Sequence, residues 1–345
     1  MPARADGVRL EFRYTADVIG VASGGIHRGA GYEGRAELSL DADLAKLFGW
    51  RGTTLHARAF QIHGYQVSEN YLGNVMTASN IEAHPTTRLY DLWLQKALGG
   101  GASLRAGQLA ADEELLVSDT ASVFINGTFG WAPLAAANIT NGGPGYPLAA
   151  PGIRLRLEPK QDTALLVAAF AGDPAGGGCD GDPQRCNRYG TTFSTSGGTL
   201  WMSELQLAGG GYKLGGWYQN GSFSDRSGNG ALYAIADRQL WRSGARELHG
   251  FVRLGAAPSD RNLVKSYVDA GLSYKGLLAG RPDDELALGA AHAELQDGSE
   301  SLLELSYLAP LTPQLSLQPD LQYVVQRGTD IPDAWVIALR ANVRF

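Results

Sequence analysis

The sequence contains no apolar run as long as the roughly 18 residues that a membrane-spanning helix requires. Residues 163–171 are among the longest such runs and fall well short of that length. A mean hydropathy of −0.15 and a net charge of −6 would by themselves describe a soluble chain. The same values are typical of transmembrane β-barrels, because half of every strand in such a barrel faces a wet lumen.

The sequence also lacks the patterns of nucleic-acid binding, metal coordination and nucleophilic catalysis. Its mild acidity offers no basic footprint for nucleic acid. The six histidines form no metal-spaced pair, and no Gly-x-Ser-x-Gly elbow is present. His56 and His249 are candidates for lumen positions, where occasional histidines are common without a catalytic role. We therefore expect no catalytic residues, no cofactor and no metal site.

Only two cysteines occur, Cys179 and Cys186, in a segment rich in Gly, Asp and Pro. Two ligands are too few for a structural zinc site, and an oxidising compartment favours a bridge. We expect a disulfide, with a fragment of a metal site as the alternative. Asp180 and Asp182 could join a calcium site, although solvated loop acids account for them as well.

A secretory signal is also missing, since residues 1–5 lead directly into a strand-like pattern. We interpret the sequence as a mature chain with an added start. Its export signal peptide would then be absent from this chain.

What the sequence has in abundance is two-residue alternation, which is clearest in residues 333–345. One face is wholly apolar and comprises Trp335, Ile337, Leu339, Ala341, Val343 and Phe345; the other comprises Val336, Ala338, Arg340, Asn342 and Arg344. Ten steps of ~3.3 Å at a tilt near 40° rise about 25 Å, which is the height of the lipid-facing band of a transmembrane barrel. The segment therefore predicts the strand that closes an outer-membrane β-barrel.

Similar alternation recurs along the whole chain and predicts an all-β antiparallel transmembrane barrel of about sixteen strands, in a single domain of residues 1–345. The predicted strands are residues 8–18, 32–41, 53–63, 87–98, 102–109, 152–158, 163–171, 200–207, 212–220, 231–241, 247–254, 263–274, 285–293, 301–308, 314–325 and 333–345. A soluble β-sandwich or β-helix is the alternative, but so many charged inner faces would not form a packed core.

The phase of the closing strand predicts which side chains face lipid and which face the lumen. The lipid-facing set includes Leu38, Leu40, Tyr90, Leu92, Leu94, Leu248, Val252, Leu315, Leu317 and Leu321. The lumen-facing set includes Arg9, Glu37, Asp91, Glu204, Gln318, Gln322 and Arg340. Long outer connections are expected at residues 64–85, 110–150, 173–199 and 221–230, with both termini on the side of the short turns.

Four blocks in the first half of the chain are distinctive: YDLWLQK at residues 90–96, LRAGQLAADEELLVSD at 104–119, FINGTFGW at 124–131 and GGPGYPLAAPGIRLR at 142–156. These blocks resemble the carbohydrate-selective porin family of the outer membrane, the OprB-like porins. The resemblance runs from Tyr32 to Phe345. It implies a sixteen-stranded barrel that passes sugars by diffusion and forms a homotrimer in the lipopolysaccharide-bearing outer membrane.

The segment 110–150 has no strand period and is too apolar to lie in solvent. Such a long connection is usually functional or disordered, and its composition is not that of a disordered chain. We expect it to fold into the barrel as a constriction. Acidic Glu113, Glu114 and Asp119 would then face Arg58, Arg105, Arg154 or Arg156, with Trp93 close by.

The arginines and the inward-facing tryptophans each have two possible roles. The arginines could brace loop acids or form the positive side of an eyelet, and both can hold at once. Trp93, and similarly Trp217, would pack on the inserted loop or meet a sugar ring. We predict a porin for monosaccharides and small oligosaccharides. A general or organic-acid porin, or a closed barrel serving as an anchor or docking platform, is the alternative.

Overall fold

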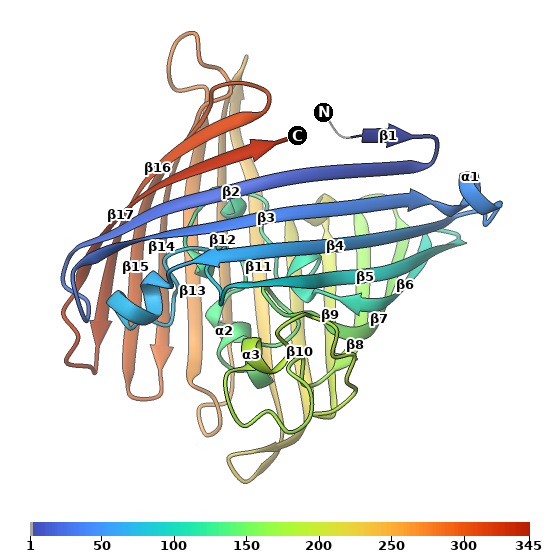
Figure 1. The fold of residues 1–345 in the computed structure, drawn as a ribbon, viewed down its shortest axis with the longest axis horizontal. Coiled ribbons are helices and arrows are strands. Elements are labelled where there is room, and N and C mark those ends of the chain that lie inside the picture. The colour runs from blue at the N-terminus through green and yellow to red at the C-terminus, as the bar shows by residue number, and fades with distance from the viewer. Residues whose placement is uncertain (1–2) are drawn as a thin grey trace.

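Strand pairing runs without a break around the lumen (Figure 1). The computed structural model describes residues 3–345, and its sheet contains seventeen strands. Sixteen of them, β2 to β17, form a ring that closes where β17 pairs with β2. The predicted all-β barrel of about sixteen strands is therefore confirmed. The remaining strand, β1 (Ala3–Ala5), pairs with the first residues of β2.

The ring consists of β2 (Val8–Ser23), β3 (Gly29–Asp43), β4 (Thr53–Gly64), β5 (Thr86–Gly99), β6 (Ala102–Leu109), β7 (Ala150–Lys160), β8 (Thr163–Ala171), β9 (Thr199–Leu207), β10 (Tyr212–Phe223), β11 (Arg226–Ser243), β12 (Arg246–Ala256), β13 (Val264–Lys275), β14 (Glu285–Leu295), β15 (Gly298–Pro310), β16 (Leu315–Arg327) and β17 (Ala334–Arg344). Short helical elements lie in the connections: α1 (Leu44–Phe48), the π-helical turn η1 (Ser68–Leu72), η2 (Ala111–Glu113), η3 (Ala121–Val123), η4 (Gly127–Phe129), α2 (Pro133–Ala136), η5 (Thr140–Gly142), α3 (Pro183–Cys186) and η6 (Ala208–Gly210). No helix within residues 3–345 is long and apolar enough to cross a membrane.

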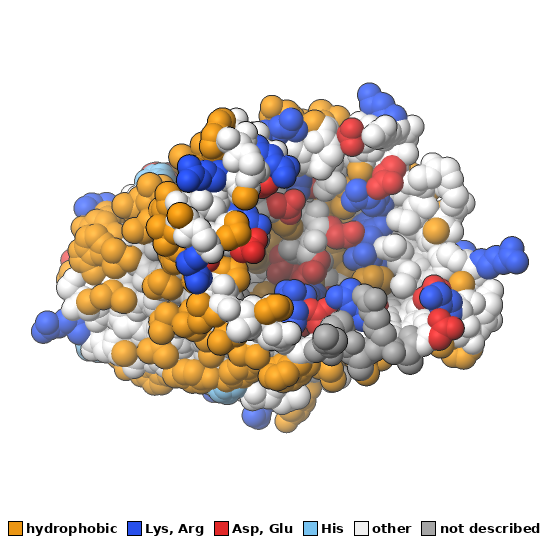
Figure 2. All heavy atoms as spheres, turned by 90° about the horizontal axis from the view of Figure 1, so that it is seen from above, with side chains coloured by type: hydrophobic (Ala, Val, Ile, Leu, Met, Phe, Trp, Pro, Cys, Tyr) orange, Lys and Arg blue, Asp and Glu red, His pale blue; other side chains and the backbone are white. Residues whose placement is uncertain are grey.

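The closing strand shows why the chain forms a barrel. Arg340 on β17 is the register partner of Asp17 on β2, and both side chains are buried inside. The next pair, Leu339 and Val18, is exposed on the outside by 47% and 53%. Side chains alternate across a strand, so polar groups fill the lumen while apolar groups cover the outer wall. Figure 2 shows the result, with acidic and basic side chains gathered in the hollow and apolar ones on the flanks.

Aromatic side chains mark both ends of the apolar band. Tyr323 and Trp335 pack against each other near the outer ends of β16 and β17, with tilted rings whose centroids are 4.6 Å apart. Phe12 and Phe345 pair at the end where the chain begins and ends, at 5.5 Å. Such girdles are typical of the two membrane interfaces of an outer-membrane barrel.

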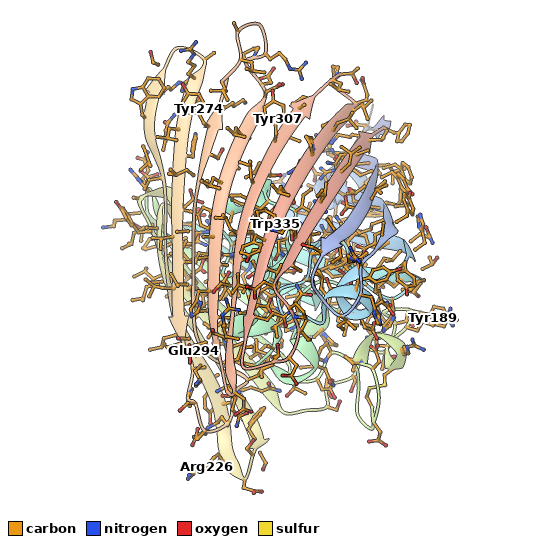
Figure 3. All side chains as sticks on the ribbon, turned by 90° about the vertical axis from the view of Figure 1, so that its left-hand side faces the viewer. Tyr189, Arg226, Tyr274, Glu294, Tyr307 and Trp335 are labelled. Atoms are coloured by element: carbon orange, nitrogen blue, oxygen red, sulfur yellow. A yellow bond between two sulfur atoms is a disulfide. The ribbon has the colours of Figure 1, made fainter. Side chains whose placement is uncertain are left out.

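One predicted outer loop is wrong. Residues 221–230 are not a loop: β10 and β11 continue as a paired hairpin that turns at Ser224 and Asp225, both with positive φ. Its tip, marked by Arg226, extends well beyond the neighbouring strands in Figure 3. The segment contains Gly, Ser and Asn on both faces because it leaves the apolar band, so it carries no two-residue alternation to be recognised.

Tyr90 was also assigned to the wrong face. In the register between β4 and β5, Arg58 pairs with Asp91 and Ala59 pairs with Leu89, which leaves Tyr90 as an extra residue in a β-bulge. A bulge rotates one side chain relative to simple alternation. Tyr90 is therefore 2% exposed instead of facing lipid, and its hydroxyl donates to Asp112 Oδ1 at 2.8 Å.

Candidate functional site

Residues 110–149, here called the inward segment, fold into the lumen and fill one side of it with apolar side chains. Phe124 and Phe129 are almost fully buried, with ring centroids 4.3 Å apart, and both approach Phe251 on the wall. Gly289 on β14 makes room for them, because a Cβ atom there would lie 2.7 Å from Phe124 Cζ. Burial of this kind stabilises each large apolar side chain by about 1.5–3 kcal/mol.

Polar groups of the wall hold the same segment by its backbone. The guanidinium of Arg253, which is 1% exposed, donates to the carbonyls of Leu116, Thr128 and Gly130 at 3.1, 2.9 and 3.2 Å. Its charge is balanced by Asp269 on the neighbouring strand. Since backbone groups without partners are costly away from water, these donors specify where the segment lies.

Carboxylates of the wall accept hydrogen bonds from backbone N–H groups of the same segment. Glu204 accepts from Leu116 N at 2.9 Å, Asp237 from Thr120 N at 2.9 Å and Glu304 from Ile125 N at 2.6 Å. Hydrogen bonds to charged groups contribute about 1.5–3 kcal/mol each. The segment is therefore docked at several separate points.

A second connection, residues 65–85, also enters the lumen, which the sequence did not reveal. Glu300 accepts from Val75 N and Met76 N at 2.8 and 2.7 Å, and Gln322 Nε2 donates to the carbonyl of Ala78 at 2.9 Å. Apolar Val67, Leu72, Met76 and Ile81 are buried there. These apolar side chains were the signal in the sequence that the segment is buried. From the sequence alone, the segment is instead interpreted as an ordinary outer loop.

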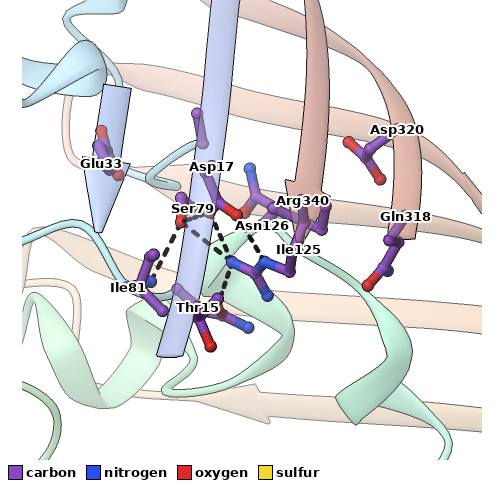
Figure 4. A network of polar contacts seen from close by, with 12 residues as sticks. Thr15, Asp17, Glu33, Ser79, Ile81, Ile125, Asn126, Gln318, Asp320 and Arg340 are labelled. Carbon is purple, nitrogen blue, oxygen red and sulfur yellow. Dashed lines mark hydrogen bonds and ion pairs between the residues drawn. The ribbon is translucent and has the colours of Figure 1, made fainter. Parts of the chain in front are cut away.

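Asp17 on β2 and Arg340 on β17 hold residues 65–85 against the wall (Figure 4). Asp17 accepts from Arg340 Nε and from Ser79 Oγ, each at 2.7 Å. Arg340 Nη2 also donates to Asn80 Oδ1 at 2.8 Å. One buried ion pair therefore joins β2, β17 and the inward connection.

The two inward connections leave a cavity of about 710 Å³ along the wall of β2–β4 and β17. Its lining extends from Pro147 and Gln184, in the outer connections, to the turn at Pro310–Leu315 at the other end of the barrel. The cavity thus follows the length of the lumen.

Two arginines of the wall face this cavity over aromatic rings. Arg35 Cζ lies 4.8 Å from the centroid of Phe60 and 5.0 Å from that of Tyr146. Arg58 Cζ lies 5.0 Å from the centroid of Tyr90. Such stacking holds a guanidinium in place while leaving its edge free to donate hydrogen bonds. Arg35 was not singled out from the sequence, although it lies two residues before lumen-facing Glu37 in the predicted strand 32–41 and therefore on the same inner face.

Loop acids stand opposite these arginines. Arg58 Nη2 lies 2.7 Å from Glu113 Oε1 and also pairs with Asp91. Arg58 and Glu113 line the main cavity and a second cavity of about 380 Å³, so their ion pair lies between the two. The positive wall and the negative loop meet at this pair.

The second cavity is lined by most of the other residues that the sequence analysis assigned to the constriction. Glu114 accepts from Arg154 Nε at 2.7 Å and lies 3.3 Å from Arg105 Nη1. Trp93 lies between His56, at 4.8 Å from centroid to centroid, and the guanidinium of Arg105, at 3.8 Å. These partners come from the strands on either side of β5, so both faces of the indole are covered.

Three selected residues lie elsewhere. Arg156 pairs with Glu158 at 2.8 Å instead of with a loop acid. Asp119 is exposed and forms no ion pair within residues 3–345. Trp217 is 4% exposed and packs in the apolar cluster that contains the inward segment.

The disulfide between Cys179 and Cys186 is present, as expected. Within residues 3–345 no three His, Cys, Asp or Glu side chains are grouped so that they could hold a metal ion.

Two acids of the inward connections have unusual proton affinity. Burial, together with the charge of Glu113, raises the pKa of Asp112 to about 7. Burial likewise raises the pKa of Glu82 to about 7. Because the folded pKa exceeds the unfolded one, each group favours the folded state at low pH. That contribution is lost as pH rises from near 4 to 7.

Both acids line the main cavity, so its charge should change with pH. We predict that the cation-to-anion permeability ratio rises about twofold between pH 5.5 and 8.5, as the two carboxyls ionise. Asp112→Asn combined with Glu82→Gln should flatten the profile. Reversal potentials in a salt gradient provide the measurement, and an unchanged rise in the double variant would contradict the assignment.

Comparison with known proteins agrees with this architecture. The family model described as carbohydrate-selective porin, OprB family, matches residues 27–345. Porin B of Pseudomonas aeruginosa is 22% identical over 385 aligned residues, covering 91% of this chain and 82% of that protein.

Solved structures share the fold. The high-pH structure of Pseudomonas putida OprB has a TM-score of 0.86 at 19% identity, over 98% of this chain and 94% of that chain. An anion-selective porin from Comamonas acidovorans has a TM-score of 0.63 at 12% identity, over 99% of this chain and 100% of that chain.

Proposed function

The chain belongs to the OprB family of carbohydrate-selective porins, and from this premise we propose that its main cavity is a passive diffusion path for monosaccharides and small oligosaccharides. It is a sugar-selective porin of the outer membrane. We further propose which side chains form hydrogen bonds with the sugar in this cavity. We place Arg35 and Arg58 along the wall side of the path and Asp112 and Glu113 along its loop side, with the two rows in contact at the Arg58–Glu113 ion pair.

The observation that supports this assignment is the opposed arrangement of charge. Arg58 and Glu113 meet at 2.7 Å beside the cavity, with an aromatic floor under the guanidinium. Guanidinium groups donate and carboxylates accept, whereas a sugar hydroxyl does both. A neutral, hydroxyl-rich solute can therefore exchange hydrogen bonds with both rows as it moves, while an ion is attracted by one row and repelled by the other.

Trp93 has a supporting role in this proposal. Because His56 and Arg105 cover its two faces, the ring is not free to stack on a sugar. We assign it, with Arg105, Glu114 and Arg154, to bracing the first residues of the inward segment. In this proposal these four residues stabilise the inward segment and do not contact the sugar.

Liposome swelling with a graded series of neutral sugars tests the proposal. Monosaccharides should enter fastest, disaccharides more slowly and larger oligosaccharides hardly at all. A barrel that serves only as an anchor would give no swelling above that of empty liposomes. Equal rates for all sizes would overturn the size-selective path.

The apolar outer belt would contact membrane lipid and lipopolysaccharide, and the barrel would assemble as a homotrimer. Light scattering on the detergent-solubilised protein would separate a trimer from a monomer.

A further inference from the structure

The outer connection between β8 and β9 contains the disulfide and has no role in the channel described so far. Cys179 and Cys186 close a short turn that carries α3 (Pro183–Cys186). Asp182 fixes the start of this helix, since its Oδ1 accepts from Gln184 N at 2.8 Å. The turn is thus held both covalently and by its own hydrogen bonds.

The same connection is attached to the inside of the barrel. Leu89 N donates to the carbonyl of Tyr189 at 3.0 Å, and Gln108 Nε2 donates to that of Gly190 at 2.8 Å. Both contacts place the segment against the outer ends of β5 and β6. It therefore cannot swing freely above the barrel.

Arg88 joins this connection to the inward segment. Its guanidinium is 2% exposed and donates to the carbonyl of Asn187, one residue after α3. It also donates to the carbonyl of Pro147 at 3.0 Å, at the end of the inward segment. The disulfide turn and the inward segment consequently share one buried anchor.

Gln184 is the side chain that this arrangement directs into the channel. It lines the main cavity together with Glu82, Tyr146 and Pro147. Its Oε1 accepts from His84 N at 2.8 Å, while its Nε2 has no hydrogen-bond partner within residues 3–345. An amide held by one atom, with free donors on the other, can donate to a passing hydroxyl.

We propose that the disulfide-closed turn is a fixed part of the outer mouth of the channel and that Gln184 is a specificity-determining residue there. A solute arriving from outside meets this amide before it reaches Arg35 and Arg58. The inference rests on the proposed function for its substrate class, but the position of Gln184 in the path can be tested without any sugar.

Gln184→Glu is the decisive variant, since a carboxylate keeps the acceptor for His84 N. Arg185→Gln is its matched control: it changes the formal charge by the same amount, and the Arg185 side chain is 74% exposed. At pH 8.5 in a salt gradient, Gln184→Glu should raise the cation-to-anion permeability ratio about twofold, as expected for one unit charge near the ion path. Arg185→Gln should leave the ratio unchanged.

A third variant tests the role of the disulfide. In a Cys179→Ser, Cys186→Ser background, the effect of Gln184→Glu should fall to less than half. Equal effects of Gln184→Glu and Arg185→Gln would overturn the proposal, and an undiminished effect without the disulfide would overturn its positioning role. Neither result depends on sugar transport, so a failure here is distinguishable from a failure of the proposed function.

Discussion

Deleting residues 117–146 should raise the single-channel conductance severalfold and abolish discrimination by sugar size. These residues fill one side of the lumen, and their apolar core around Phe124 and Phe129 narrows the open path beside the main cavity. The barrel should survive, because Leu109 and Ala150 are register partners on adjacent strands and a short connection can join them. The wall groups that lose loop partners, such as Arg253 and Glu304, would be solvated by lumen water.

Planar-bilayer conductance and swelling rates measure this prediction. Removal of the β10–β11 hairpin tip, residues 222–227, is the control, since it shortens an outer segment that lines neither cavity. Only the first deletion should change the conductance. If conductance and size cutoff stayed the same, residues 117–146 would not form the constriction.

Replacing both Arg35 and Arg58 by Gln should weaken sugar block of the ion current tenfold or more. Each guanidinium offers charged hydrogen bonds, which contribute about 1.5–3 kcal/mol, and a loss of about 1.4 kcal/mol is a tenfold change in affinity. The same change removes two positive charges from the path, so the channel should also become more cation-selective. Sugar titrations of the single-channel current give the half-blocking concentration.

A double variant with Arg9→Gln and Arg156→Gln is the matched control. These two arginines also point inward on the sheet and are paired with acids, but they do not line the main cavity. The charge change is identical. If both double variants weakened the block equally, the effect would come from overall charge and not from Arg35 and Arg58.

The fold could be predicted because lipid and water impose opposite demands on alternate residues. Leu339 and Arg340 illustrate this, since placing an arginine in the lipid-facing phase would cost about 2–4 kcal/mol. Where that demand disappears, prediction failed. The β10–β11 hairpin extends past the apolar band, and the bulge at Tyr90 shifts the phase through backbone pairing that no side-chain pattern records.

The site was less predictable for a related reason. Residues 110–150 were selected because their apolar side chains needed cover, and Arg58 with Glu113 followed from charge placed on facing elements. The positions of Arg35 and of residues 65–85 depend on how two connections share the lumen. That packing is long-range: Glu300 holds Val75, and Arg340 holds Asn80. Asp119 and Arg156 show the converse, since charge alone did not determine which acids and bases meet.

Opposed charge rows should select small neutral sugars, and liposome swelling with three solutes of equal size measures this selection. A neutral hexose, its amino-sugar analogue and its sugar-acid analogue should be compared at one pH and ionic strength. The neutral hexose should enter fastest, because each charged analogue is repelled by one of the two rows. Faster entry of the sugar acid would instead identify an organic-acid porin, and equal rates for all three would identify a general diffusion pore.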